Sequence, residues 1–484
     1  MADTDKKIKT ADEERAGHPQ SAHFIFLGIV GLAFIALAVV FLCFPRPRYS
    51  ELEKRELTEF PDVTSYGAKI TELPSDISSW FSDSQPFRDD FMGMSMNIRD
   101  AIGFHFGNPE DNISFKPSEP GSVAAEASPE YVMEDLEAAG NPLADAIAKQ
   151  SNSGTIVVGS GKNVRALMGF GGTPKMGEIF LNMVREYVKA VPGVTFYALI
   201  PPAATEFYLP DKARKLSKPE KPVLDYIEEN LPEGVKYVDA YTYLAAHTDE
   251  DIYLRTDHHW APLGAFYAAK ALAITAGVPF KELDSYDRHV IPGFVGSMYG
   301  YTQDIAVKNA PEDFVYYTPR GLNHKSTYTK YKTNKDYQVV SAEGPYQDNF
   351  FQEYESKQAY LTFMGGDQYL VKINTGTPSK RKLMVIKDSY GNPLPSFLFY
   401  SFGEIHVVDW RFFPLNLPDY VKKNGITDIV FAFNIFNAVT STSMKHVTKF
   451  LTQDGSFASS SKESQKKTSK ESQSKKSEGK NSTR

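Results

Sequence analysis

The sequence is poor in cysteine: Cys43 is the only one in 484 residues. A single thiol excludes an intramolecular disulfide framework and any zinc site built from several thiolates. It does not place the protein inside the cell, because large extracytoplasmic domains can fold without disulfides. Apolar residues make up 42% of the chain and aromatic residues 13%. This globular composition excludes wholesale disorder, collagen and coiled coil as the main state.

The chain also lacks an excess of positive charge. The net charge is −7, with 53 Lys and Arg against 60 Asp and Glu. This balance argues against nucleic acid as the main partner, which would favour a basic face. No glycine-rich loop of the kind that cradles phosphate stands between a predicted strand and a helix, so we expect no nucleotide cofactor. No internal repeat is visible.

One long apolar run stands near the N-terminus. Residues 24–44 are all apolar or glycine, and at about 1.5 Å per residue a helix of this length spans the roughly 30 Å hydrocarbon layer. The run is longer than a signal-peptide core and lacks a small-x-small cleavage site, which favours an uncleaved anchor over a signal peptide. Lys and Arg are balanced on its two sides, so charge does not orient it. The short arm before it and the large body after it favour a signal anchor with the body outside the cytoplasm.

The remaining sequence divides by composition into five segments. Residues 1–22 form a cytoplasmic arm before the anchor at 23–44, and residues 45–107 form a stalk followed by a helical segment. Residues 108–150 are acidic and proline-rich and predict a linker. Residues 151–454 form the main domain, and residues 455–484 form a Lys- and Ser-rich tail too poor in apolar residues to fold. The tail is either a solvated tail or a segment that adheres to anionic cell-wall polymer or lipid.

The main domain alternates between strand and helix patterns. We expect strands at 155–158, 194–200, 236–240, 383–387, 404–408 and 428–433, and helices at 176–191, 222–231, 262–276 and 397–402. Nearly continuous apolar strands that alternate with helices indicate a parallel sheet covered on both faces. Residues 292–376 interrupt this rhythm, so we interpret them as a β-rich insertion, with a hairpin-like stretch at 361–373.

Two short stretches carry candidate chemistry. The first is Thr256-Asp257-His258-His259-Trp260, just before the predicted helix at 262–276. The second is Lys387-Asp388-Ser389-Tyr390-Gly391-Asn392, at the carboxyl end of a predicted strand, where ligand crevices of open α/β sheets lie. A nucleophilic serine needs a base, and the base needs an orienting carboxylate. Asp257 and His259 have a spacing that can supply both to Ser389.

Other interpretations of these residues stay open at this point. Adjacent histidines before a helix can be structural residues or half of a metal site, and phosphoesterases with an Asp-His-His run bind metals. Those enzymes need further aspartates in an N-terminal signature that this chain lacks, so we expect no metal. Ser389 can also be a turn serine that hydrogen-bonds its own backbone.

Together, the two stretches resemble the DHHW family, which is similar to the AlgX/AlgJ-like polysaccharide O-acetyltransferases of SGNH-hydrolase-like fold. Further stretches resemble the family: Glu53-Lys54-Arg55-Glu56-Leu57, Gln85-Pro86-Phe87-Arg88-Asp89, Glu206-Phe207-Tyr208-Leu209-Pro210, Gly296-Ser297-Met298-Tyr299 and Val407-Val408-Asp409-Trp410-Arg411. The resemblance covers roughly residues 50–445, apart from the acidic linker. It implies an α/β fold of three layers around a central parallel sheet. Lys387 stands where many SGNH enzymes have glycine.

The resemblance also implies roles for single residues. Ser389 would be the nucleophile, His259 the base and Asp257 its orienter, in the permuted order in which an Asp-x-His pair precedes the serine. The Ser389 N–H would help to stabilise the oxyanion. The further candidates for substrate contact or oxyanion stabilisation are Arg411, Asn434, Tyr390, Asn392 and His258.

These observations favour a membrane-anchored, extracytoplasmic serine acyltransferase that O-acetylates a cell-surface or exported polysaccharide. The resemblance implies a membrane-bound O-acyltransferase as the partner that supplies the acyl group. The alternatives are a carbohydrate esterase with the same triad, and a non-catalytic glycan-binding scaffold of a cell-envelope assembly complex. The test between catalyst and scaffold is whether Ser389 and His259 come within hydrogen-bond reach, with Asp257 behind His259.

Overall fold

The computed structural model describes residues 18–46, 49–50, 55–56, 58–61, 73–92, 94, 113–117, 152–302, 304–333, 338–367 and 369–455. The chain divides into two compact units, Met1–Arg99 and Asp100–Arg484. Most of the predicted arm and linker, and the predicted tail beyond residue 455, lie outside the described residues.

The first unit contains a long helix and a short one. Helix α2 (His18–Cys43) covers the apolar run, strands β1 (Tyr49–Ser50) and β2 (Arg55–Glu56) pair antiparallel, and helix α3 is Leu73–Asp83. Trp80 of α3 packs edge-on against Phe41 and Phe60, with ring centroids 6.3 and 4.9 Å away. Among the described residues, no helix reaches the length and hydropathy of a membrane span. The membrane crossing at 24–44 therefore stays a prediction.

The second unit begins with a small antiparallel sheet. Its strands are β3 (Ile113–Pro117), β4 (Asn152–Val158) and β5 (Arg165–Phe170), in the order β3-β4-β5. Strand β3 lies inside the segment predicted as a linker, so that prediction was wrong for residues 113–117. The acidic and proline-rich composition around β3 concealed a short strand whose pairing partner, β4, lies 35 residues further on (152 against 117).

The main sheet has eight strands in the order β11-β10-β12-β14-β13-β15-β6-β7. The five strands from β14 to β7 run parallel, and β12, β10 and β11 add antiparallel pairs at one edge. The bounds are β6 (Thr195–Leu199), β7 (Val235–Val238), β10 (Lys325–Thr333), β11 (Val339–Asp348), β12 (Tyr369–Asn374), β13 (Lys382–Lys387), β14 (Glu404–Asp409) and β15 (Asp428–Ala432). The sheet is therefore mixed: the predicted parallel sheet is present in five strands, and three antiparallel strands, which were not predicted to join it, extend it.

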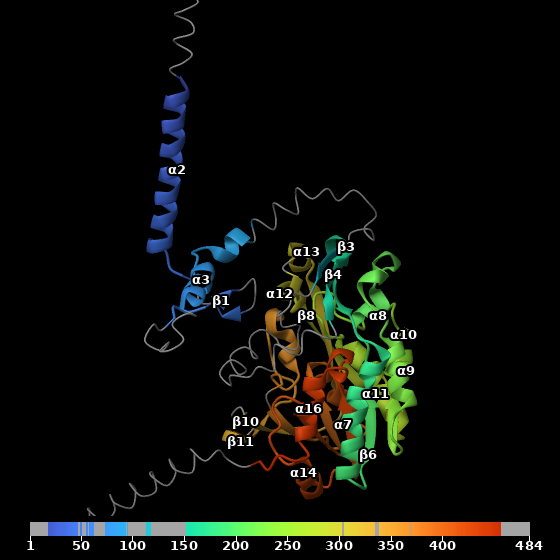
Figure 1. Ribbon diagram of the computed structural model, residues 1–484. Helices are drawn as coiled ribbons and strands as arrows, with labels where there is room; N and C mark the ends of the chain where they lie inside the picture. The colour runs from blue at the N-terminus through green and yellow to red at the C-terminus, as the bar shows by residue number, and fades with distance from the viewer. Residues whose placement is uncertain are drawn as a thin grey trace, which may run out of the picture. The chain divides into compact units, whose positions relative to one another are not determined.

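Helices cover both faces of this sheet (Figure 1). Alternate strand residues face opposite sides: Leu383 and Val385 of β13 join the core beneath α11, whereas Met384 and Ile386 join the core beneath α7 and α16. The helices are α7 (Gly177–Ala190), α8 (Ala204–Tyr208), α9 (Lys221–Glu229), α10 (Ala240–Ala245), α11 (Pro262–Ala276), α12 (Met298–Thr302), α13 (Ile305–Lys308), α14 (Leu417–Asn424), α15 (Ile435–Ala438) and α16 (Ser441–Lys449). This is a three-layer α/β arrangement.

The segment predicted as an insertion takes part in the main fold. Strands β8 (Tyr286–Phe294) and β9 (Glu312–Pro319) form a separate antiparallel pair, whereas β10, β11 and β12 extend the main sheet. The hairpin expected at 361–373 is absent from the described part of that stretch. There, the 3₁₀ helix η8 (Ser356–Thr362) precedes a turn, and β12 pairs with β10 and β14. The aromatic and β-branched residues predicted strands but not their distant partners.

The carboxyl ends of the parallel strands meet at one edge. Lys387 at the end of β13 is in register with Asp409 of β14 and with Ala432 of β15. The residues that follow these three ends are Ser389, Arg411 and Asn434, so the sheet brings three of the predicted site residues to one edge.

Candidate active site

Ser389 lies in a tight turn directly after β13. Asp388 caps the short 3₁₀ helix η9 (Ser389–Gly391): its Oδ1 accepts a hydrogen bond from the Tyr390 N–H at 3.0 Å. Its Oδ2 accepts from the backbone of Asn434 at 2.7 Å and from the side chain of Asn437 at 3.1 Å. The buried carboxylate therefore ties the serine turn to the end of β15.

The turn that carries Asp257 and His259 is held by groups from β9 and from the loop before α12. The Glu312 carboxylate accepts from the Arg255 N–H at 2.8 Å, the Thr256 N–H at 2.7 Å and the Thr256 hydroxyl at 2.7 Å. The Ser297 N–H donates to Asp257 Oδ2 at 2.8 Å. The residues just before Asp257 and the Asp257 carboxylate are thus both held by residues that are distant in the sequence.

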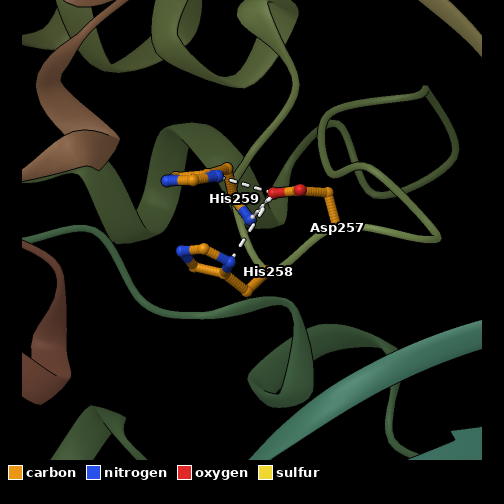
Figure 2. Close-up of side chains that lie close together, drawn as sticks. All are labelled: Asp257, His258 and His259. Carbon is orange, nitrogen blue, oxygen red and sulfur yellow. Dashed lines mark hydrogen bonds and ion pairs between the residues drawn. The ribbon is translucent and has the colours of Figure 1, made fainter. Parts of the chain in front are cut away.

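Asp257, His259 and Ser389 form a continuous hydrogen-bonded line. His259 Nδ1 lies 2.5 Å from Asp257 Oδ1, and His259 Nε2 lies 2.7 Å from Ser389 Oγ. The His259 N–H also donates to Asp257 Oδ1 at 2.9 Å, which fixes the carboxylate against its own turn (Figure 2). All three side chains belong to buried residues, between 4% and 6% exposed. The test set by the sequence, hydrogen-bond reach with Asp257 behind the base, is met.

The electrostatics suit this arrangement. Burial alone would raise the pKa of Asp257, but the contacts with His259 and His258 and the Ser297 N–H hold the pKa well below its ordinary value. The carboxylate is therefore ionised and accepts the Nδ1–H of His259. Burial and the neighbouring His259 lower the pKa of His258 to about 3, so His258 is neutral at physiological pH.

Two rings hold the imidazole of His259 in place. Tyr360 from η8 stacks on it with a centroid distance of 4.0 Å and an interplanar angle of 15°. His258 lies 3.8 Å away at 37°. Two rings this close cannot occupy the same face, so they clamp the imidazole from both sides. The Tyr360 hydroxyl also donates to the carbonyl oxygen of Ser389 at 3.1 Å.

Tyr390 joins the two motifs directly. Its hydroxyl donates to the His258 carbonyl at 2.6 Å, and its own carbonyl accepts from the Trp260 indole N–H at 2.7 Å. With the bond between His259 and Ser389, residues 258 to 260 make three contacts to residues 389 and 390. Tyr390 thus holds the two turns together, and it also lines a small pocket. Its predicted contact with substrate stays a prediction.

Asp257, His258 and His259 are also the kind of residues that could hold a metal ion, since their ligand atoms lie within 4.8 Å of one another. The distance of 2.5 Å between Asp257 Oδ1 and His259 Nδ1 is that of a hydrogen bond. Two ligands of one tetrahedral Zn²⁺, each about 2.0–2.2 Å from the ion, would lie roughly 3.4 Å apart. As placed, these side chains fit a shared proton and do not fit a metal.

Asn434 and Asn392 lie at the same edge in different roles. Asn434 caps α15 by accepting from the Asn437 N–H at 3.0 Å, and it lines a small pocket with His258 and Tyr390. Asn392 is buried and its side chain hydrogen-bonds to Asp367, whereas its Oδ1 has no partner among the described residues.

Arg411 belongs to a buried ion network rather than to an open surface. Its guanidinium donates to Asp409 at 2.8 Å and to Asp367 at 2.9 Å, and the Lys387 ammonium lies 2.7 Å from Asp367 and 3.0 Å from Asp409. Burial alone would lower the pKa of Lys387, but the two carboxylates hold it above its ordinary value. The network therefore holds Lys387 in place, two positions before Ser389.

Sequence reasoning gave no role to four residues that shape this site. Tyr360 stacks on the base, and Glu312 holds the turn that carries Asp257 and His259. Lys387 bonds Asp367 next to the serine turn. Lys387 carried a weak signal, because it replaces a common glycine. Tyr360, Glu312 and Asp367 lie in the stretch interpreted as an insertion, where nothing in the local pattern pointed to the site.

The search of curated proteins found no match. Several solved structures are similar to this chain at low identity, among them the following two. PatB1 of Bacillus cereus, solved with a sulfonyl adduct, shares 22% identity, with a TM-score of 0.46 over 58% of this chain and 95% of that one. The O-acetyltransferase domain of Pseudomonas putida AlgJ shares 13%, with a TM-score of 0.35 over 60% of this chain and 98% of that one. Similarity at this level carries no conclusion about function.

The family assignment rests on two stronger matches. The profile of the DHHW protein family matches residues 124–408, more than half of the chain. A crystal structure of a DHHW family protein from Eubacterium siraeum shares 38% identity, with a TM-score of 0.56 over 60% of this chain and 94% of that one. This chain belongs to the DHHW protein family.

Proposed function

We propose that this protein is a serine acyltransferase that moves an acetyl group onto a hydroxyl of a cell-surface or exported polysaccharide. The observation that carries the proposal is the hydrogen-bonded line from Asp257 through His259 to Ser389. Nucleophile, base and orienter are the three parts that covalent acyl transfer needs. The acetyl group and the glycan acceptor are expectations from the resemblance to the AlgX/AlgJ-like proteins.

In the first half of the reaction, Ser389 Oγ attacks the carbonyl carbon of the acyl donor while its proton passes to His259 Nε2. Asp257 stabilises the imidazolium through the Nδ1–H. The tetrahedral intermediate collapses when the donor's leaving oxygen or sulfur takes the proton from Nε2. An acetyl ester on Ser389 remains.

In the second half, a sugar hydroxyl gives its proton to His259 Nε2 and attacks the acetyl-serine. The Ser389 oxygen leaves and takes that proton back, which releases the O-acetylated sugar and restores the resting enzyme. If water takes the place of the sugar, the same residues make an esterase. The difference lies in acceptor binding and water exclusion.

The oxyanion formed in both halves needs hydrogen-bond donors. The turn's own hydrogen bonds use the N–H groups of Tyr390, Gly391 and Asn392. We therefore assign the Ser389 N–H, with the Asn434 side chain at the end of the neighbouring strand, as donors to the oxyanion.

The location of the reaction is also part of the proposal. We infer that residues 24–44 anchor the chain in the cell membrane as a single pass, with the second unit outside the cytoplasm. Support comes from the uninterrupted apolar run and from the large exposed side chains of α2, with Phe24 74% and Leu32 68% exposed. A membrane-bound O-acyltransferase would then deliver the acetyl group across the membrane.

The deciding experiment compares the full chain with Ser389→Ala. Both are incubated with a chromogenic acetyl ester and an oligosaccharide acceptor. Acetylated sugar made only by the unmodified protein is the expected result. Acetate release without acetylated sugar would favour the esterase, and no Ser389-dependent turnover by two folded proteins would favour the glycan-binding scaffold.

Anchoring is tested separately in intact cells. Protease added outside should degrade the second unit of the full chain, and carbonate extraction should leave the protein in the membrane fraction. A variant that lacks residues 1–44 should appear in the soluble fraction; recovery of both proteins there would refute the anchor.

A further inference from the structure

His258 has one ring nitrogen without a partner. The residue is 8% exposed, and its Nε2 is buried with no hydrogen-bond partner among the described residues. A buried polar nitrogen left unpaired is costly, because it has given up its hydrogen bond to water without a replacement. Such a group in a candidate active site calls for a ligand that completes it.

The other nitrogen decides which tautomer His258 adopts. His258 Nδ1 lies 2.6 Å from Ser297 Oγ, and no other hydrogen bond of that hydroxyl appears among the described residues. If Nδ1 carried the proton, both the serine hydroxyl hydrogen and the Nε2 lone pair would be unpaired. If the hydroxyl donates to Nδ1, only the Nε2–H is unpaired. Asp257 Oδ1 also lies 3.7 Å from Nδ1, which is beyond hydrogen-bond distance. The second arrangement satisfies more hydrogen-bonding groups, so we infer that the proton of the neutral ring lies on Nε2.

The Nε2–H faces the reacting groups. Figure 2 shows the outer nitrogens of His258 and His259 pointing the same way, away from Asp257. The two ring centroids are 3.8 Å apart, and the outer nitrogen of His259 lies 2.7 Å from Ser389 Oγ. The Nε2–H of His258 therefore points to the same side of the paired rings as the nitrogen that bonds the nucleophile.

His258 also lines a small pocket. It has a volume of about 10 Å³, which is room for about one water molecule, and His258, Tyr390 and Asn434 line it. Ala203, Ala204, Leu167 and Phe436 supply apolar walls. Its size and this mixture of polar groups and apolar walls suit a single carbonyl oxygen.

We propose that His258 is a catalytic residue whose Nε2–H donates a hydrogen bond to the acyl carbonyl oxygen as that oxygen gains negative charge. The inference rests on the proposed acyl transfer and adds a neutral imidazole donor to it. Burial supports this role, because a ring whose pKa lies near 3 stays neutral and does not compete with His259 for a proton. Ser297 is the positioning residue that selects the tautomer.

The test measures kcat and KM of the full chain with a chromogenic acetyl ester. His258→Phe keeps the ring and removes the donor, and we expect kcat to fall about 100-fold with KM within about twofold. His258→Gln keeps an N–H donor and should lose no more than about tenfold. His289→Phe removes a histidine that bonds Thr318 on the β8–β9 ribbon, and it should behave like the unmodified protein.

A second measurement does not depend on turnover. Nitrogen-15 NMR of the labelled histidines should show His258 protonated at Nε2 in the unmodified protein. In Ser297→Ala, which keeps the backbone N–H that Asp257 accepts, the proton should move toward Nδ1 and kcat should fall about tenfold.

The possible results distinguish a failure of the His258 role from a failure of the proposed acyl transfer. A folded His258→Phe variant with kcat within twofold of the unmodified protein, or a proton on Nδ1, would overturn the role of His258 alone. Absence of Ser389-dependent turnover in the unmodified protein would overturn the proposed function itself.

Discussion

At the scale of single residues, the environment of His259 is the most constrained in the site. Its two nitrogens bond Asp257 and Ser389, and both ring faces are covered, by Tyr360 and His258. The ring has one orientation available, which is what proton transfer between fixed partners requires. Tyr360, whose ring covers one face of the imidazole, should therefore affect rate without contributing chemistry.

We expect Tyr360→Leu to lower kcat/KM about tenfold, because the stacked face that orients the imidazole is lost. Tyr360→Phe keeps that face and should stay within about threefold. Tyr286→Leu is the matched control, since Tyr286 is buried in the same core and bonds the Phe397 carbonyl away from His259. Equal losses in Tyr360→Phe and Tyr360→Leu would assign the effect to the hydroxyl instead.

Gly296 lies so close to Asp257 that it leaves no room for a side chain. A Cβ at this position would lie 2.3 Å from the Asp257 Cβ and 2.4 Å from its Oδ2, so any side chain must displace the orienting carboxylate. We expect Gly296→Ala to lower kcat/KM about 100-fold and to cost roughly 1–3 kcal/mol of the free energy of unfolding. Val295→Ala, one position earlier, should leave kcat/KM nearly unchanged. Full activity in Gly296→Ala would show that the loop can retreat.

At the scale of elements, the ion network joins the end of β13 to the end of β14 and to the loop before β12. Lys387 is nearly fully buried, and its ammonium bonds one carboxylate from each of the other two segments. Buried pairs of this kind stabilise little against an apolar replacement of both partners, but the loss of one partner leaves a charge uncompensated.

We therefore expect Lys387→Met to lower the free energy of unfolding by about 3–5 kcal/mol. Adding Asp367→Asn should restore part of that loss, because without Lys387 the single cation Arg411 faces two carboxylates and the substitution removes the excess negative charge. Urea denaturation of both variants measures this. Lys382→Met on the same strand is the control: Lys382 is 35% exposed and pairs with Glu404, so its loss should cost less than about 1 kcal/mol. Equal costs at 387 and 382 would contradict the prediction.

At the scale of the whole molecule, buried neutral histidines should make the protein sensitive to acid. Burial lowers the pKa of His258 and of His446 to about 3, against about 6.5 in the unfolded chain. Between pH 6.5 and pH 3 the unfolded state binds protons that the folded state does not, so stability falls as pH falls.

Each of these two histidines should remove about 2 kcal/mol from the free energy of unfolding between pH 7 and pH 5. His446→Phe places an apolar ring against Trp410 and Phe450 and should abolish one of the two contributions. Urea denaturation at both pH values measures the difference. An unchanged loss between pH 7 and pH 5 in His446→Phe would contradict this assignment.

Local pattern predicted local structure well. The proline and the apolar residues of 262–276 predicted a helix with these bounds, and α11 has them. The apolar run at 383–387 predicted β13 to within one residue. Helix capping and strand alternation act over a few residues, so they can be read from a short stretch of sequence.

Short stretches of sequence were enough to identify the residues that could carry chemistry. The Asp-x-His spacing before a helix and a serine after a buried strand specify Asp257, His259 and Ser389 as a possible set, because these are properties of neighbouring residues. Only the tertiary structure decided that the set meets, that Tyr360 clamps the base, that Lys387 is tied to two carboxylates, and that β10 to β12 extend the main sheet. Those contacts join segments separated by tens to more than a hundred residues, and such pairings depend on how the whole chain packs rather than on any local pattern.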